Sequence, residues 1–177
     1  EDPSQGITFD RVNAESALIA AREAVDAGVE AFVYLSVRDK PPFVPPDFLT
    51  GKRRAEREVP EQHPELRTVS LRPNLVYGPR RRGSAPIAAV LNQLPDGSAG
   101  GYAAGDGHPL PVELVAAAAV HAALTPTLSG PLTVPQIADV GRTSGLLNLD
   151  EVSEPSLTPL LVGLGGAALG TWLLRRW

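Results

Sequence analysis

Three segments define the predicted fold: VEAFVYLS at residues 29–36, FLTGKRRAE at 48–56 and ELRTVSLRPNLVYGP at 65–79. Two short runs in these segments are rich in β-branched and aromatic residues, namely Ala31–Ser36 and Thr68–Leu71. The segment between them is charged and contains many helix-forming residues. This alternation predicts a β-α-β unit with two buried parallel strands.

Helices are expected before and after the first of these strands. Residues 10–27 carry apolar side chains at helical spacing, and Gly28 is typical of the position just past a helix end. The segment PPFVPP (41–46) predicts a stiff extended loop, because proline fixes φ and restricts the residue before it. The next helix is expected to run from Asp47, as its N-cap, to about Val59.

Beyond Pro79 the expected elements are shorter. We expect a helix over 85–94, a surface loop over 95–109, a short extended segment and an Ala-rich helix over Pro111–Leu124, and a short strand with a helix start over Gly130–Ile137. The predicted fold class is therefore α/β, with a partial Rossmann-like parallel sheet and flanking helices.

Composition excludes several functions. The 177 residues carry a net charge of −4, and the basic residues are not interleaved with aromatics, so nucleic acid is not an expected partner. There is no Cys, and His63, His108 and His121 lie far apart, so we expect no metal. There is also no Met, which predicts that Glu1 is a processed terminus, for example after removal of a transit peptide, or the start of a fragment.

The C-terminal tail has a different character. Leu157–Leu174 contains no charged residue and is followed by Arg175, Arg176 and Trp177. As a helix it would extend roughly 27 Å, close to the ~30 Å of bilayer hydrocarbon. We expect a transmembrane helix in contact with lipid; the alternative is a buried core helix. The predicted organisation is a half-Rossmann domain at 1–140, a linker at 141–156 and a transmembrane tail at 157–177.

The middle motifs resemble the second half of an atypical or extended short-chain dehydrogenase/reductase. In that family a strand ends in Ser, a Tyr-x-x-x-Lys follows on a helix, and the next strand leads into Arg-Pro-x-x-x-Tyr-Gly-Pro. Here these positions hold Ser36, Lys52 and the segment 72–79. The resemblance is closest to the mitochondrial ubiquinone-biosynthesis member and next to the Rossmann-type accessory subunit of respiratory complex I. It implies that Ser36, Lys52 and Pro73 are vestiges of a dinucleotide site.

Two departures from the family pattern argue against catalysis. No glycine fingerprint follows a strand near the N-terminus, so the turn that would hold a pyrophosphate is not found. Phe48 stands at the position of the catalytic Tyr, and a phenyl ring has no proton to transfer. Lys52 remains able to contact a ribose hydroxyl; the alternative is a solvated charge on a helix face. Ser36 is likewise a common residue at a strand end. We therefore expect no catalytic residue and no cofactor.

Three functions stay open at this point. The favoured one is a non-catalytic accessory subunit of a respiratory-chain complex in the mitochondrial inner membrane. The second is an NAD(P)-binding protein of ubiquinone biosynthesis whose nucleotide site another chain completes, and the third is a membrane-tethered scaffold. The strand that would precede Ala31–Ser36 in the family's sheet is not apparent. We therefore expect another subunit of the complex to cover the open edge of Ala31–Ser36.

Overall fold

The structure is a computed structural model that describes residues 6–39, 44–80, 84–94 and 107–155. The predicted transmembrane helix over 157–174 lies outside these residues. Within the described ranges, no helix combines the length and the apolar character needed to cross a bilayer.

The sheet confirms the predicted parallel unit. Three parallel strands lie in the order β1-β2-β5, with bounds β1 Ala31–Leu35, β2 Arg67–Leu71 and β5 Gly130–Leu132. Val69 of β2 lies opposite Val33 on one side and Gly130 on the other. A second parallel pair joins β3 (Val76–Tyr77) to β4 (Leu110–Pro111). β1 is thus an edge strand of the described sheet.

The helices before and after β1 are present, and the second differs from its predicted bounds. A π-helical turn, Arg11–Glu15, leads into α1 (Ser16–Asp26), and Gly28 follows with φ +71°. The helix α2 spans Pro46–Gln62. Its N-cap is Pro45, so the prediction of Asp47 as N-cap was wrong. Pro46 lies within the first turn, where proline is well tolerated because its missing N–H has no partner there.

The C-terminal end of α2 was also predicted too early. The helix continues past Val59 and includes Pro60 before it ends at Gln62. Proline usually breaks a helix, but here only two residues of the helix follow it, so little of the hydrogen-bonded ladder is lost.

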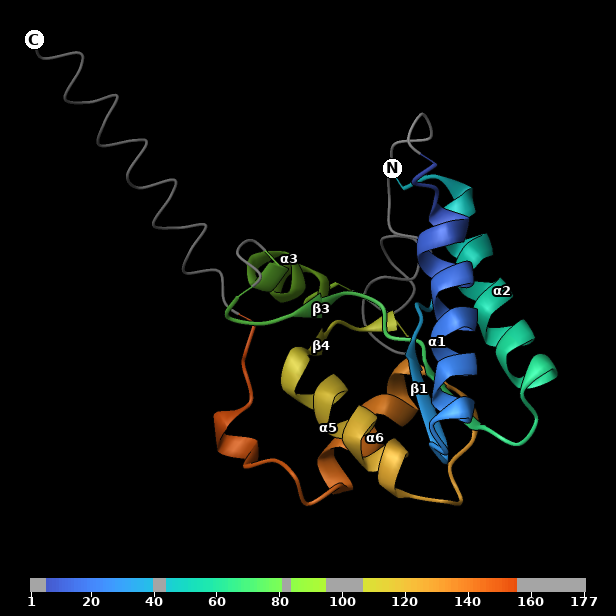
Figure 1. Cartoon of the computed structure of the whole chain (residues 1–177). Coiled ribbons are helices and arrows are strands. Elements are labelled where there is room, and N and C mark those ends of the chain that lie inside the picture. The colour runs from blue at the N-terminus through green and yellow to red at the C-terminus, as the bar shows by residue number, and fades with distance from the viewer. Residues whose placement is uncertain (1–5, 40–43, 81–83, 95–106, 156–177) are drawn as a thin grey trace, which may run out of the picture.

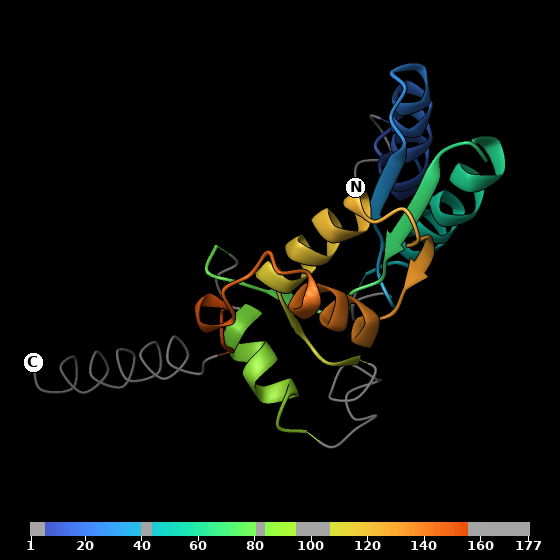
Figure 2. The ribbon, with the colours of Figure 1, turned by 90° about the horizontal axis from the view of Figure 1, so that it is seen from below.

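Helices cover both faces of the sheet (Figures 1 and 2). α1 and α2 lie on one face. On the other face lie α5 and α6, and α3 packs beside β3. The bounds are α3 Ser84–Leu91, α5 Val112–Leu124 and α6 Val134–Thr143, with a short 3-10 turn at Leu149–Glu151. α6 therefore ends inside the segment that we expected as a linker.

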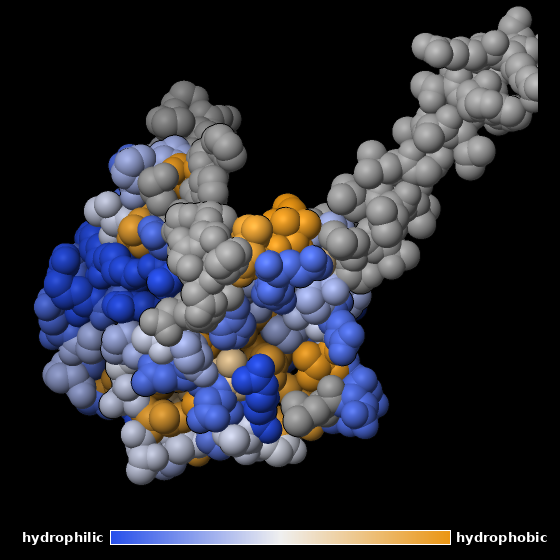
Figure 3. All heavy atoms as spheres, turned by 180° about the vertical axis from the view of Figure 1, so that it is seen from behind, coloured by the Kyte–Doolittle hydropathy of each residue, from blue (hydrophilic) through white to orange (hydrophobic). Residues whose placement is uncertain are grey.

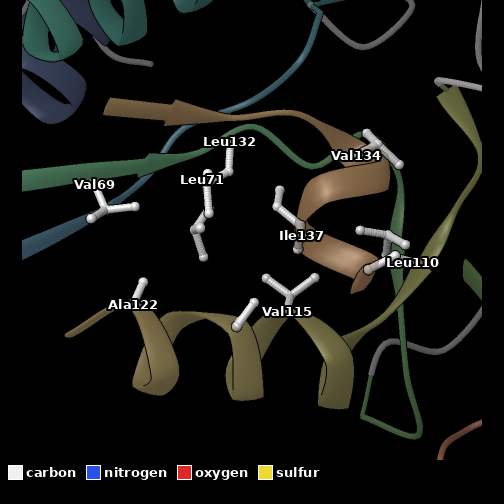
Figure 4. Packing of buried hydrophobic residues seen from close by; sticks show 10 residues of the cluster. Val69, Leu71, Leu110, Val115, Ala122, Leu132, Val134 and Ile137 are labelled. Carbon is white, nitrogen blue, oxygen red and sulfur yellow. The ribbon is translucent and has the colours of Figure 1, made fainter. Parts of the chain in front are cut away.

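The main core lies between the sheet and the helices α5 and α6 (Figure 4). Val69, Leu71 and Leu132 point from the strands toward Val115 of α5 and Ile137 of α6, and all five are buried. Each such side chain contributes about 1.5–3 kcal/mol when it is fully removed from water. A smaller cluster of Ala21, Val59 and Leu66 joins α1, α2 and the start of β2.

Gly141 sets how closely α5 and α6 approach. A Cβ atom at this position would lie 2.5 Å from the backbone oxygen of Leu114, which real Cβ atoms do not do. The contact is with backbone, so no flexible side chain can move aside. At Gly51 of α2, by contrast, the nearest atom to a built Cβ would be the oxygen of Phe9 at 3.1 Å.

This difference gives a test of the helix packing. Helix propensity alone predicts that Gly141→Ala stabilises the protein by about 1 kcal/mol. We instead expect the free energy of unfolding to fall by about 2 kcal/mol, because α5 and α6 are forced apart. Denaturant titration followed by circular dichroism measures it. Gly51→Ala is the matched control and should remain within about 1 kcal/mol of the wild type. A Gly141→Ala chain as stable as wild type would contradict the packing.

Candidate functional site

The site that the sequence predicts lies at the carboxyl ends of β1 and β2. Ser36 directly follows β1 and is 5% exposed, and its N–H donates to the oxygen of Leu71 at 2.8 Å. Pro73 follows β2 and is buried, and its oxygen accepts from the N–H of Arg38 at 2.8 Å. The carboxyl edge is where open α/β sheets bind ligands. The structure therefore brings Ser36 and Pro73 to one edge.

Lys52 reaches the same edge from α2, and its ammonium group is held by the protein itself. Its Nζ donates to the oxygen of Leu35 at 2.9 Å and lies 4.9 Å from the centre of the Tyr34 ring. The Tyr34 hydroxyl in turn donates to the oxygen of Asn13 at 2.8 Å. Partial burial lowers the pKa of Lys52, and the nearby carboxylate of Glu56 only partly opposes this shift. Lys52 thus fixes α2 to the end of β1.

Phe48 lies one helical turn before Lys52 and packs against another aromatic ring. The rings of Phe48 and Phe9 meet edge to face, with centroids 5.6 Å apart and planes at 82°. This is a favourable arrangement for two apolar rings. The position that would carry the acid/base phenol of the family is therefore part of a hydrophobic contact between α2 and the segment before α1.

A buried carboxylate, that of Glu56, links α2 to the carboxyl end of β2. This residue was not singled out from the sequence. Glu56 has a side chain only 6% exposed and accepts hydrogen bonds from Arg72, whose Nε lies 3.0 Å from each carboxylate oxygen. Arg53 donates to Glu56 at 2.7 Å and also to Ser36 Oγ at 3.4 Å and to the oxygen of Arg38 at 2.7 Å. One carboxylate thus binds two guanidinium groups.

The pKa of Glu56 reflects this network. Burial raises it, but the hydrogen bonds from Arg72 and Ser36 and the positive charges of Arg53 and Arg72 together lower it below the usual value. Glu56 is therefore ionised at neutral pH and held between α2 and the end of β2. A sequence signal for it did exist: Glu56 lies four residues after Lys52, on the same helix face.

The described residues include no group of three or more His, Asp or Glu side chains able to hold a metal ion. The donors and acceptors at the carboxyl edge mostly bind one another. Chemically the arrangement is a network of ion pairs that fixes α2 on the sheet.

Comparisons with known proteins cover part of the chain. No family model matches it. A stretch of 74 residues is 40% identical to the uncharacterized chloroplastic protein At1g32220 of Arabidopsis thaliana. The match covers 40% of this chain, and the matched stretch spans only about 25% of that relative's length.

Several solved structures are similar in fold, at low identity. They include a UDP-N-acetylglucosamine 4-epimerase of Methanobrevibacter ruminantium in complex with UDP-N-acetylmuramic acid (15% identity, TM-score 0.48, 73% of this chain and 51% of that one). The enzyme WbmG of Bordetella bronchiseptica, in complex with NAD and UDP, is 18% identical with a TM-score of 0.47 over 82% of this chain and 53% of that one. A Thermus thermophilus UDP-glucose 4-epimerase in complex with NAD is 20% identical, with a TM-score of 0.45 over 81% of this chain and 58% of that one.

These values carry no inference about function. The partial Rossmann-like fold rests on the strand order and on the helices that cover both faces of the sheet.

The Glu56 network predicts a loss of stability in acid. Because its folded pKa is lowered, Glu56 contributes stability above the usual value of 4.5, and that contribution is lost as the pH falls below it. Glu56→Gln should reduce the free energy of unfolding at pH 7 by about 2 kcal/mol and weaken its decline in acid. Denaturant titrations at pH 7 and below pH 4.5 measure both.

Glu58→Gln is the matched control. Glu58 lies on the same helix and also binds two arginines, Arg54 and Arg57, but its side chain is 20% exposed. We expect a much smaller change for it. Equal effects of the two substitutions would show that burial of Glu56 does not matter.

Proposed function

We propose that this chain is a non-catalytic accessory subunit of a membrane complex, derived from an atypical short-chain dehydrogenase/reductase. The observation that carries the proposal is the packing of Phe48 against Phe9. Proton transfer needs a titratable group at that position, and the phenyl ring supplies only hydrophobic contact. Lys52, which would assist such a group, instead donates to the backbone oxygen of Leu35.

The outer edge of β1 supports a role in binding another polypeptide. The N–H of Ser36 donates to Leu71 and the oxygen of Glu30 accepts from Arg67, so even-numbered residues of this segment face β2. Backbone groups of neighbouring strand residues face opposite edges, so Ala31, Val33 and Leu35 face outward. No described strand pairs with this edge, although its Leu35 oxygen already accepts from Lys52. An exposed strand edge is a ready template for a further strand.

The outer surface of α5 supports the same partner. This helix packs on β1 and β2, yet Val112, Val120 and Leu124 are 42%, 48% and 72% exposed. These side chains follow one another at four- or eight-residue intervals, which places them on one face of the helix. A helix that is apolar on all sides is normally buried. A parallel strand added beside β1 would bring its own crossover helix onto a face of the sheet. On the face that α5 covers, that helix would pack beside α5, which contacts β1.

The organelle is part of the proposal and rests on resemblance. The likeness to mitochondrial members of the dehydrogenase/reductase family favours the mitochondrial inner membrane and a respiratory-chain complex. The Arabidopsis relative is named as chloroplastic, which makes a plastid membrane the alternative.

Two other functions stand beside this one. An NAD(P)-binding protein of ubiquinone biosynthesis is favoured by the position of Ser36, Lys52 and Pro73 at the carboxyl edge of the sheet, with the rest of the nucleotide site supplied by another polypeptide. A membrane-tethered scaffold would need only the tail and the partner surface.

Nucleotide binding separates these functions. We expect no stoichiometric binding of NADH or NADPH to the 177-residue chain in calorimetry, and no reductase activity after Phe48→Tyr, because the phenol alone does not complete a nucleotide site. Tight binding of either nucleotide with one-to-one stoichiometry would favour the second function over the first.

Partner binding tests the proposed surface on α5. Val120→Lys places a charge on the exposed apolar face, and we expect the partner to be lost on purification from membranes. Ile87→Lys on α3 is the matched control, since Ile87 is 55% exposed and Val120 is 48% exposed. Quantitative mass spectrometry of the co-purified subunits measures both variants. Retention of the same partners by both would contradict an interface on α5.

A further inference from the structure

A hollow lined by arginines, hydroxyl groups and prolines lies on the face of the sheet opposite the main core. Its volume of about 520 Å³ lies in the size range of small-ligand sites. The hollow is bounded by α2, by β2 and by β5. It is separate from the outer edge of β1, because β2 lies between β1 and β5.

The strand β2 forms the floor of this hollow and differs on its two faces. Val69 and Leu71 point into the main core, whereas Thr68, Ser70 and Arg72 alternate with them and line the hollow. Central strands of parallel sheets are usually apolar on both faces. Ser70 is only 3% exposed. The floor is therefore a buried polar surface.

The charge of the hollow is strongly positive. Its lining includes four arginines, Arg53, Arg57, Arg67 and Arg72, and one carboxylate, that of Glu56. Glu56 binds both Arg53 and Arg72 and so balances one of their two charges. Figure 3 shows strongly hydrophilic side chains gathered over the side of the molecule that α2 forms.

The four arginines differ in how firmly they are held. Arg67 donates to the oxygens of Ala122, Ala123 and Leu128, which fixes it as a structural cation beyond the end of α5. Arg57, by contrast, is 61% exposed and shares Glu58 with Arg54. Its ion pair with Glu58 is exposed to solvent, so Arg57 is the least firmly held of the four arginines.

We propose that this hollow binds a small molecule through an oxyanion, either phosphate or carboxylate. Planar guanidinium groups bind such oxyanions with paired hydrogen bonds, and Arg53 and Arg72 are already held in place by Glu56. The Ser70 hydroxyl supplies a neutral donor at the floor. Arg57 closes the rim. This site is distinct from the proposed partner surface and does not depend on it.

Titration with pyrophosphate and with citrate tests the proposal on the 177-residue chain. Both probes are used at constant ionic strength, with calorimetry for affinity and amide chemical shifts for location. We expect saturable binding with shifts centred on Ser70 and Arg72. The tighter of the two probes identifies phosphate or carboxylate as the preferred group.

Two variants make the test specific. Arg57→Gln and Ser70→Ala should each weaken binding by about threefold to tenfold, the loss of one hydrogen bond to a charged group. Arg22→Gln is the matched control, because Arg22 is also 61% exposed and pairs with a neighbouring glutamate. Its affinity should be unchanged. The proposal is overturned if neither probe binds, or if Arg57→Gln and Arg22→Gln weaken binding equally.

Discussion

The parallel pairing of β1 with β2 is the constraint on which the other features depend. It places Ser36 beside Leu71, and thereby puts the ends of both strands at one edge. It also leaves the backbone N–H and C=O groups of the odd-numbered residues of β1 pointing away from β2. Helices cover both faces of the sheet. Among the described residues, β1 has a neighbouring strand on one side only, so the backbone groups on its other side could pair with a further strand. A parallel sheet that stops here favours completion by another polypeptide.

The ion pairs of α2 follow from the same geometry. α2 crosses the face of β2, so a carboxylate on its inner side reaches the guanidinium that ends the strand. Glu56 therefore joins α2 to Arg72 and, through Arg53, to Ser36. Ser36 and Lys52 are held at this edge by other groups of the protein, since Ser36 Oγ accepts from Arg53 and Lys52 donates to the oxygen of Leu35. This internal pairing, together with the Phe48–Phe9 contact, is the physical basis for proposing a structural role.

The sequence was sufficient to predict the elements whose signals are local. The β-branched runs of β1 and β2 and the glycine after α1 were enough for the parallel unit and for a helix end. The start of α2 was misplaced because Asp47 and Pro46 both suit a helix start, and the first-turn proline decided it. The end of α2 depends on the packing of Val59 against Ala21 and Leu66. These residues lie on different elements, so a local sequence pattern does not reveal their contact.

The contacts of the site were harder to predict than its position. The edge that holds Ser36, Lys52 and Pro73 followed from the motif order. The partners of Phe48 and Glu56 did not, because Phe9 and Arg72 lie 39 and 16 residues away along the chain. Spacing reveals neighbours on one helix face, whereas these contacts depend on how α2 lies against α1 and β2. The expected transmembrane tail and its lipid contacts stay predictions.

Hydrogen exchange along β1 measures whether another polypeptide completes the sheet at this strand. The amides of Phe32 and Tyr34 face β2, while those of Ala31, Val33 and Leu35 face outward. We expect the outward amides to exchange rapidly in the isolated chain and slowly in the complex purified from membranes. Slow exchange of Ala31, Val33 and Leu35 in an isolated, monomeric chain would contradict it.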